Sequence, residues 1–357
     1  MREVDYIVVG LGIAGLCFAE LLQKHGKSFI VFDSELNTST KISGGVFNPI
    51  VLKRFTIAWK ANEHSIESLS FYKSIARKLN IPFLKETAVL RILSSVEEQN
   101  NWVVASDKNE LSPFLSPDIV QNDNSNINAS FGFGRVMHTA RIEPSNLLSG
   151  YKEYLQKDNR SITETFNYDK LIDRSIEGTS EIGNTYPIQY GDIWAKQIVF
   201  SEGFGAIHNP YFPKSYLIAN KGEYLIVSAP DLKLDHILKG PIFIIPLGDH
   251  LFKVGATYAR DFDSYHTTTD ARDQICGKLE KMISCDYKVV SQVAGVRPTT
   301  KDRRPLLGKL PESPNKVFLN GLGSHGILGA PFLSKILYEH LEYEVKLPGE
   351  MDIQRWL

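Results

Sequence analysis

Three glycines near the start of the chain have the spacing of a dinucleotide-binding turn. Gly10, Gly12 and Gly15 follow an apolar run, and Asp33 ends a second apolar run 18 residues after Gly15. Glycine at these positions permits a tight turn, a close approach of the backbone to a pyrophosphate and close packing of a helix on a sheet. The Asp33 carboxylate can accept hydrogen bonds from ribose hydroxyls, and it disfavours the 2′-phosphate of NADP. The motif predicts an adenine dinucleotide but does not separate FAD from NAD.

Arg297 is a residue of a type that could hold a substrate, although its type alone favours a structural role. It lies in the sequence Gly-Val-Arg-Pro-Thr, near the end of a predicted strand. A guanidinium can bind a carboxylate through two parallel hydrogen bonds and so fix the direction of a neighbouring C–H bond. The alternative is a structural arginine that pairs with a loop carboxylate, since most arginines are solvated or structural.

The predicted elements place these residues at the ends of strands. Tyr6–Gly10 and Phe29–Asp33 are expected to be buried strands joined by a helix over Ile13–His25. Ala195–Gly203 predicts another buried strand that returns the chain to the same sheet. A final strand, Lys316–Leu319, leads into a glycine-rich block and a long helix. The dinucleotide motif therefore belongs to a sheet that is assembled from distant parts of the chain.

A second, antiparallel layer is predicted from the intervening segments. Lys221–Val227, Ile242–Ile245 and Leu251–Thr257 are short strands separated by Gly and Pro. Phe55–Leu79 predicts a helix, and Glu86–Leu93 alternates like a strand. The helix carries an apolar stripe, interpreted as core, of Ile66, Leu69, Tyr72, Ile75 and Leu79.

Composition places the chain among ordinary globular proteins. Hydrophobic residues make up 43% and charged residues 23% of 357 residues. A net charge of −1 gives no global field toward nucleic acid or a membrane. Cys17, Cys276 and Cys285 have no metal-ligand spacing, so no metal is expected. There is no signal peptide and no apolar run of about 18 residues, so we expect a cytoplasmic protein.

Four blocks of the sequence, in this order, resemble the FAD-dependent oxidoreductases of the D-amino-acid oxidase and glycine oxidase superfamily. They are the glycine turn with Asp33, the loop Ser43–Gly45, the segment Gly295–Gly308 and the glycine-rich block Gly321–Pro331. Some stretches, including Val254–Tyr258, are similar to the oxidase half of the bifunctional tRNA 5-methylaminomethyl-2-thiouridine biosynthesis proteins. The methyltransferase half of those proteins has no counterpart in these 357 residues.

The resemblance implies a cofactor and a reaction. The cofactor is FAD, expected to be non-covalent because no cysteine follows Cys285, whereas some relatives attach FAD to a cysteine near the C-terminal block. An amine-bearing carbon is held over the flavin, a hydride leaves that carbon, and water hydrolyses the resulting imine. An amine that binds unprotonated needs no protein base, in keeping with the lack of an obvious acid–base pair.

The implied catalytic residues are Arg297, which would bind a substrate carboxylate, His325 and Tyr258. His325 could face the substrate or a flavin carbonyl, or it could be satisfied by the backbone. Tyr258 and Tyr224 could bond a carboxylate, although packing accounts for each more simply. The implied cofactor-binding residues are Gly10, Gly12, Ile13, Ala14, Gly15, Asp33, Ser43, Gly44, Gly45, Gly323, Ser324, Gly326 and Ile327.

The predicted fold class is α/β, with a Rossmann-type FAD-binding domain interleaved with a mainly antiparallel-sheet substrate domain. The FAD-binding domain is expected to be discontinuous and to comprise residues 1–50, 140–210 and 296–345. Residues 51–139 and 211–295 are expected to form the substrate domain, and residues 346–357 a C-terminal tail.

The predicted partners are a small amine or amino-acid substrate and O2 or another electron acceptor, with no membrane and no metal. Two alternatives remain open. The first is the oxidase step of wobble-uridine modification, with tRNA as the substrate, which the net charge does not favour. The second is a catalytically silent flavin-binding module.

Overall fold

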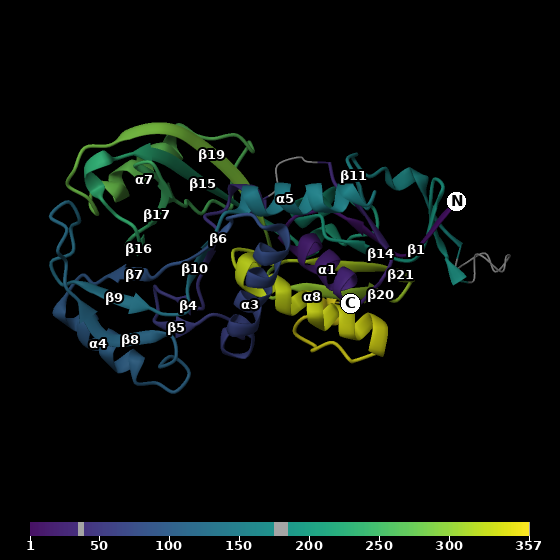
Figure 1. The fold of residues 1–357 in the computed structure, drawn as a ribbon, viewed down its shortest axis with the longest axis horizontal. Coiled ribbons are helices and arrows are strands. Elements are labelled where there is room, and N and C mark those ends of the chain that lie inside the picture. Colours follow the sequence, from purple (N-terminus) through teal and green to yellow (C-terminus); the bar gives the residue numbers. More distant parts are fainter. Residues whose placement is uncertain (35–38, 175–184, 357) are drawn as a thin grey trace.

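The computed structural model describes residues 1–34, 39–174 and 185–356, and it contains two 8-stranded sheets at opposite ends of the molecule (Figure 1). Along its main path the first sheet has the order β11–β2–β1–β14–β13–β12, and the pair β21 and β20 joins it at β14. The strands are β11 (Ser161–Ile162), β2 (Phe29–Phe32), β1 (Arg2–Val9), β14 (Ile193–Phe200), β13 (Ile188–Tyr190), β12 (Leu171–Asp173), β21 (Ser313–Asn320) and β20 (Leu306–Leu310).

The middle of the first sheet is parallel and buried. β1 pairs in parallel with both β2 and β14, and β14 pairs in parallel with β21. Covered on both faces, these strands have nearly continuous apolar sequences rather than an alternating pattern. Four helices pack on one face, α1 (Ile13–Lys24), α8 (Gly326–Tyr343), α3 (Ala61–Leu79) and α5 (Pro144–Lys157).

The second sheet has the order β19–β15–β18–β17–β16–β7–β9–β8. All its pairings are antiparallel except that of β16 with β7. One face of it packs against α7 (Thr269–Leu279). The strands are β19 (Lys288–Thr299), β15 (Ile218–Ser228), β18 (Leu251–Gly255), β17 (Phe243–Gly248), β16 (Ile237–Lys239), β7 (Val89–Ile92), β9 (Phe133–Val136) and β8 (Leu115–Val120).

A small 3-stranded sheet lies between the two large ones (Figure 1). It consists of β3 (Val46–Phe47), β10 (Ala140–Ile142) and β6 (Leu84–Glu86). Short elements complete this region, namely α2 (Ser39–Ile42), β4 (Ile50–Val51), β5 (Thr56–Ile57) and α4 (Val96–Ser106). The α/β class and the mainly antiparallel second sheet are confirmed, whereas the residue boundaries expected for the two domains stay a prediction.

Two local predictions are wrong. The helix predicted from Phe55 begins at Ala61, and Ile66 is 66% exposed instead of belonging to its core stripe. The strand predicted over Glu86–Leu93 is two strands, β6 and β7, which belong to different sheets. Among the described residues, no helix is long and apolar enough to cross a membrane.

Candidate active site

The loops that follow three strands of the first sheet meet at one edge. Val9, at the end of β1, lies opposite Phe200 of β14, and Phe200 lies opposite Phe318 of β21. The loops that begin at Gly10 and Ser201 and the block that begins at Gly321 are therefore neighbours. This carboxyl edge is where open α/β sheets bind ligands.

The structure gives a different reason for glycine at each of the three positions of the first motif. Gly10 has a φ of +94°, and Gly15 has no room for a side chain, because a Cβ there would lie 1.9 Å from the Gly10 carbonyl oxygen. A Cβ on Gly12, in contrast, would meet nothing closer than the Thr40 hydroxyl at 3.6 Å. Gly10 and Gly15 thus serve the turn and the packing of α1, and the space beside Gly12 fits a pyrophosphate.

Backbone donors at the start of α1 are organised by two side chains. The Leu11 N–H donates to Asp33 Oδ1 over 3.0 Å, and the Ile13 N–H donates to Thr40 Oγ1 over 3.1 Å. Asp33 therefore supports the glycine turn itself, and Ala14 is buried in the first turn of the helix. The sequence analysis missed Thr40, which lies on α2, because no fixed spacing links it to the glycine motif.

The loop Ser43–Gly45 packs against the second sheet on one side and against β10 of the small sheet on the other. A Cβ on Gly44 would lie 2.5 Å from Ile245 Cδ1, and a Cβ on Gly45 would lie 1.7 Å from the Ile142 carbonyl oxygen. Gly44 also lies against the Tyr224 ring, since its Cβ position is 3.3 Å from the Tyr224 hydroxyl. Both glycines are required by close packing against protein, which brings this loop onto the second sheet.

Lys253 adds a cation that the sequence analysis missed. Its ammonium donates to the Ser43 carbonyl over 2.8 Å and lies 5.2 Å from the centroid of the Tyr224 ring. Burial lowers the pKa of Lys253 to about 8, and Glu143 and Arg141 oppose each other in their smaller effects on it. In the sequence, Lys253 stands between apolar residues of β18. That pattern predicts a strand but does not predict a contact with the loop Ser43–Gly45.

Arg297 lies on β19, on the face of the second sheet that this loop touches. Asn220, directly opposite on β15, accepts a hydrogen bond from Nη1 over 2.9 Å. The Thr257 carbonyl accepts weaker bonds at 3.4 and 3.5 Å, and the Tyr258 ring centroid lies 5.6 Å from the guanidinium carbon. Gly222 leaves the space that the guanidinium fills, since a Cβ there would lie 2.2 Å from Nη2.

The guanidinium of Arg297 has neutral neighbours. Among the residues that the structure describes, no carboxylate lies within ion-pair distance of it. The alternative of a structural arginine paired with a loop carboxylate is not observed there. Tyr258 is 55% exposed, so its ring covers one side of the guanidinium without closing the site. The geometry leaves Arg297 able to bind an anion.

The glycine-rich block connects the first motif to the Arg297 strand. The Gly323 N–H donates to the Pro298 carbonyl over 3.0 Å, directly after Arg297. At the start of α8, a Cβ on Gly326 would lie 3.1 Å from Ile13 Cγ2, at the start of α1. Ser324 is exposed, and Ile327 is buried in the first turn of α8. The structure thus joins the two glycine motifs and the arginine strand.

His325 is the N-terminal cap residue of α8 and is exposed. Its ring makes no hydrogen bond within the described part of the chain, so the backbone does not satisfy it there. Protein atoms nevertheless surround the ring, and this desolvation lowers the pKa of the imidazole. The ring is therefore neutral at pH 7, with one donor and one acceptor.

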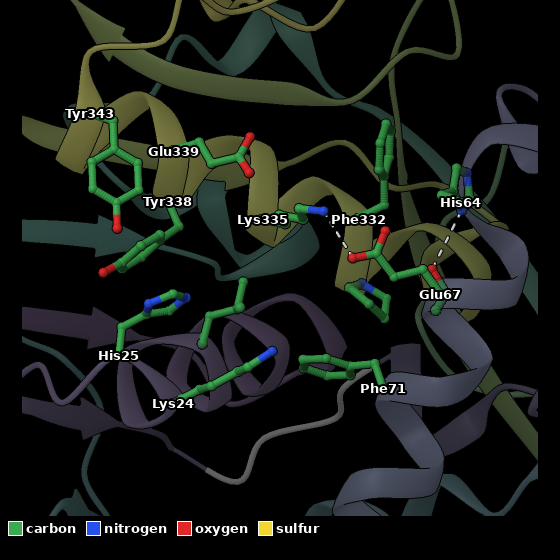
Figure 2. Close-up of a pocket in the computed structure, with 13 residues that line it drawn as sticks. Lys24, His25, His64, Glu67, Phe71, Phe332, Lys335, Tyr338, Glu339 and Tyr343 are labelled. Carbon is green, nitrogen blue, oxygen red and sulfur yellow. Dashed lines mark hydrogen bonds and ion pairs between the residues drawn. The ribbon is translucent and has the colours of Figure 1, made fainter.

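A separate cavity of about 250 Å3 lies between α1, α3 and α8 (Figure 2). Its aromatic walls include stacked pairs, His25 on Tyr338 and His64 on Phe332. None of the predicted site residues lines this cavity. Within the described ranges, no group of His, Cys, Asp and Glu residues could hold a metal ion.

The comparisons with known proteins show the family of the chain. Residues 5–340 match the family described as FAD dependent oxidoreductase (DAO). The chain therefore belongs to this family of FAD-dependent oxidoreductases, and its cofactor is FAD.

Similar proteins carry the names glycine oxidase and iminodiacetate oxidase. The chain is 23% identical to glycine oxidase from Bacillus subtilis (strain 168) over 354 residues, covering 92% of this chain and 90% of that protein. Glycine oxidase from Geobacillus kaustophilus has a similar fold, with a TM-score of 0.78, 15% identity and coverage of 100% of this chain and 98% of the other. Iminodiacetate oxidase from Chelativorans sp. BNC1 also has this fold, with a TM-score of 0.75, 16% identity and coverage of 99% and 98%. The family predicted from the four blocks is confirmed.

Proposed function

We propose that this protein oxidises the C–N bond of an amino acid or secondary amine that carries a carboxylate. The observation that carries the proposal is Arg297, a guanidinium with neutral acceptors behind it, next to the glycine-rich block at the edge of the first sheet. The names of the relatives, glycine oxidase and iminodiacetate oxidase, describe substrates with this chemistry. FAD, when bound, accepts the hydride that leaves the carbon next to nitrogen.

Arg297 has the role of binding and orienting the substrate. Asn220 holds Nη1, so the guanidinium presents its remaining donors in a fixed direction. Two parallel hydrogen bonds to a carboxylate would then fix the Cα–H bond relative to the flavin. Tyr258 packs over one side of the guanidinium and would keep water from that side of these bonds.

His325 has the role of positioning the amine. Its neutral ring can accept one hydrogen bond from an amine N–H, and a neutral partner does not favour the protonated form of that amine. An amine that arrives without its extra proton can release hydride from the adjacent carbon and become an iminium ion, which water hydrolyses to a carbonyl compound and an amine or ammonium. No protein carboxylate is needed as a base in this scheme.

The proposed cofactor-binding residues are those that the family resemblance implies. Gly12 would provide the space for the pyrophosphate, and Asp33 would accept bonds from the adenosine ribose. Gly323 and Ser324, with the N–H groups at the start of α8, would face the flavin edge that gains negative charge on reduction. The complete set is Gly10, Gly12, Ile13, Ala14, Gly15, Asp33, Ser43, Gly44, Gly45, Gly323, Ser324, Gly326 and Ile327.

An anaerobic flavin-reduction screen tests the proposal. The FAD-loaded protein is mixed with glycine, sarcosine, iminodiacetate, proline and larger amino acids, and the flavin absorbance is followed. We expect at least one carboxylate-bearing amine to bleach the flavin, and the matched amine without a carboxylate, such as dimethylamine for sarcosine, to react far more slowly.

Two outcomes would contradict the proposal. A flavin that dithionite reduces but that no amine reduces would indicate the catalytically silent flavin-binding module. Reduction only by tRNA that carries carboxymethylaminomethyl-uridine would indicate the oxidase step of tRNA modification.

A further inference from the structure

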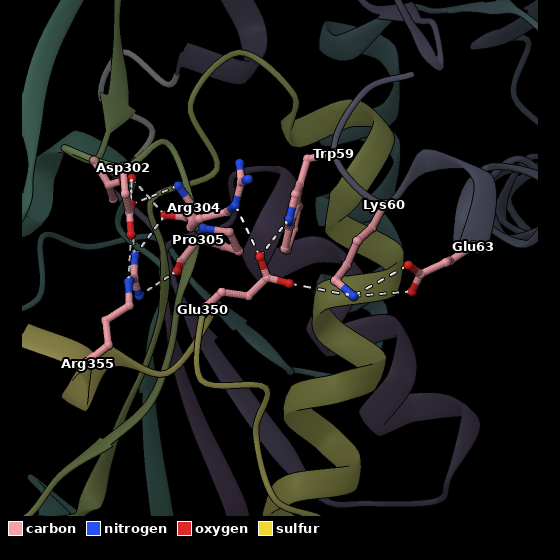
Figure 3. Close-up of polar contacts among 9 residues, drawn as sticks. Trp59, Lys60, Glu63, Asp302, Arg304, Pro305, Glu350 and Arg355 are labelled. Carbon is pink, nitrogen blue, oxygen red and sulfur yellow. Dashed lines mark hydrogen bonds and ion pairs between the residues drawn. The ribbon is translucent and has the colours of Figure 1, made fainter. Parts of the chain in front are cut away.

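Arg355 joins the C-terminal segment, residues 350–356, to the turn that follows Arg297 (Figure 3). Arg355 Nε and Nη2 donate to the two oxygens of Asp302 over 2.8 and 3.1 Å. Nη1 donates to the carbonyls of Pro305 and Asp352 over 3.0 and 2.9 Å, and Nη2 also donates to the Arg304 carbonyl over 3.2 Å. All five N–H donors of the guanidinium therefore meet acceptors, so Arg355 has none left for a ligand.

Arg355 itself lies on a firmly packed segment. The Met351 carbonyl accepts a hydrogen bond from the Leu307 N–H over 2.8 Å, and the side chains of Met351 and Ile353 are fully buried. Trp356 packs edge-on against Tyr216, with ring centroids 4.9 Å apart. The Arg355 side chain is only 11% exposed, whereas the Asp302 side chain is 36% exposed, so solvent reaches the pair from the carboxylate side only. The segment is thus a fixed support for the turn.

A second contact ties the same segment to the turn. Glu350 Oε2 accepts hydrogen bonds from Arg304 Nε over 3.2 Å and from Trp59 Nε1 over 3.0 Å (Figure 3). The Arg304 guanidinium also lies 5.2 Å from the centroid of the Trp59 ring. Arg304 is therefore occupied by these neighbours, and it belongs to the support of the turn.

The supported turn, residues 300–305, contacts both halves of the candidate site. It begins one residue after β19 ends, three positions after Arg297. Inside the turn, the Thr300 hydroxyl donates to the Arg304 carbonyl over 2.7 Å. On the other side, Thr300 Cγ2 lies 2.8 Å from where a Cβ on Gly321 would be, so the turn packs tightly on the glycine-rich block. A displacement of this turn would move the Arg297 strand end and the block together.

We propose that Arg355 is a positioning residue for the flavin site. By holding the turn 300–305 with four of its five hydrogen bonds, it sets the distance between the Arg297 guanidinium and the glycine-rich block that begins at Gly321. The effect of Arg355 on substrate binding rests on the function proposed above. Its effect on the position of the glycine-rich block does not depend on that function. A lysine cannot replace it, because three donors on a point charge cannot meet five acceptors in this fork geometry.

The test compares Arg355→Ala, Arg355→Lys and Asp302→Asn with the matched control Lys335→Ala. Lys335 also forms an ion pair, with Glu67 of α3 over 2.9 Å, but this pair is exposed and lies at the separate cavity between α1, α3 and α8. The readouts are the Kd of FAD, the visible circular dichroism of bound flavin and the Kd of benzoate, a carboxylate that flavin cannot oxidise. Thermal unfolding of each holoprotein is recorded in parallel.

We expect Arg355→Ala to raise the Kd of FAD and of benzoate about tenfold or more, within the usual range of coupling between sites. The circular dichroism of the bound flavin should change as well. Asp302→Asn should raise both Kd values in the same way as Arg355→Ala. Arg355→Lys should raise them less than Arg355→Ala but should not reach the wild-type values. Lys335→Ala should match the wild type. The proposal is overturned if Arg355→Ala lowers the unfolding temperature but leaves both Kd values and the flavin dichroism unchanged.

Failure of the proposed function gives a different pattern. In that case no amine reduces the wild-type flavin, while the effects of Arg355→Ala on FAD affinity and flavin dichroism persist.

Discussion

Replacing Gly222 by alanine should displace the Arg297 guanidinium without removing its charge. The added Cβ would lie 2.2 Å from Nη2 and 2.5 Å from the central guanidinium carbon. A normal contact distance of about 3.5 Å requires a shift of more than about 1 Å. Because these atoms are the far end of a flexible side chain, the guanidinium can move while β15 and β19 stay paired.

The Gly222→Ala substitution should weaken substrate binding more than it destabilises the fold. Loss of the bond to Asn220 should destabilise the fold by about 1 kcal/mol. A substrate carboxylate that loses its charge-assisted bonds should bind about 1.5–3 kcal/mol more weakly, which raises its Kd about 10- to 150-fold. Misplacement by about 1 Å should also slow anaerobic flavin reduction about 100-fold.

The assay titrates each FAD-loaded variant with benzoate while flavin absorbance is recorded, and then measures single-turnover reduction by the best amine. Gly277→Ala on α7 is the matched control, because a Cβ there meets nothing within 4 Å. Alanine at that helical position should stabilise the protein by up to about 1 kcal/mol and leave binding unchanged. Equal benzoate Kd values for Gly222→Ala and Gly277→Ala would refute the assignment of Arg297 as the carboxylate-binding residue.

Three further predictions follow from the same geometry. Gly15→Ala should abolish FAD binding, measured by flavin fluorescence on release, because its Cβ would lie 1.9 Å from a backbone oxygen that cannot turn away. The pKa of Lys253 is about 8, so stability should rise between pH 8 and the ordinary lysine pKa of 10.5, where only the unfolded chain stays protonated. Denaturant titrations should show this rise in the wild type but not in Lys253→Met. Tyr72→Phe should cost about 1 kcal/mol in thermal unfolding, because the buried hydroxyl donates to the Ile327 carbonyl over 2.8 Å.

The parts of the site that the sequence predicts depend on local geometry. Gly10 and Gly15 are fixed by a turn and a helix start within a few residues of each other, so their spacing alone carries the information. The cofactor and family came from the order of four such blocks. Thr40 and Lys253 have no local signature, because their partners are chosen only when distant strands come together.

The error at Ile66 has a simple geometric cause. An α-helix advances by about 100° per residue, so a step of three residues falls about 60° short of a full turn. From Ile66 to Ile75 the stripe takes three such steps, which turns its end to the opposite side of the helix from its start. Ile75 is fully buried and Ile66 is 66% exposed. Residues at intervals of three share a face only when intervals of four alternate with them.

Glu223 lies on β15, the strand that pairs with the Arg297 strand, but its carboxylate points to the other side of the sheet. Gly222 faces the guanidinium, so Glu223 faces away from it. Four donors hold Glu223 there, the Lys221 ammonium at 3.0 Å, the Thr268 N–H at 2.9 Å, the Thr268 hydroxyl at 3.0 Å and the Gln292 amide at 2.8 Å. Burial raises the pKa of Glu223, but these bonds outweigh it and lower the pKa overall.

The buried ion pair of Lys221 and Glu223 also fixes the register of β15 beside Arg297. A slip of β15 by one residue would turn every side chain to the opposite face and set the Glu223 carboxylate against Arg297. That slip would bring both Lys221 and Glu223 to the Arg297 face and take from Glu223 the donors of Thr268 and Gln292, which is unfavourable for a buried carboxylate. The ion pair on one face therefore specifies the register that keeps Arg297 able to bind a carboxylate on the other. Sequence spacing alone could not reveal this coupling, because Lys221 and Glu223 look like an ordinary exposed charge pair until β15 is known to be covered on that face.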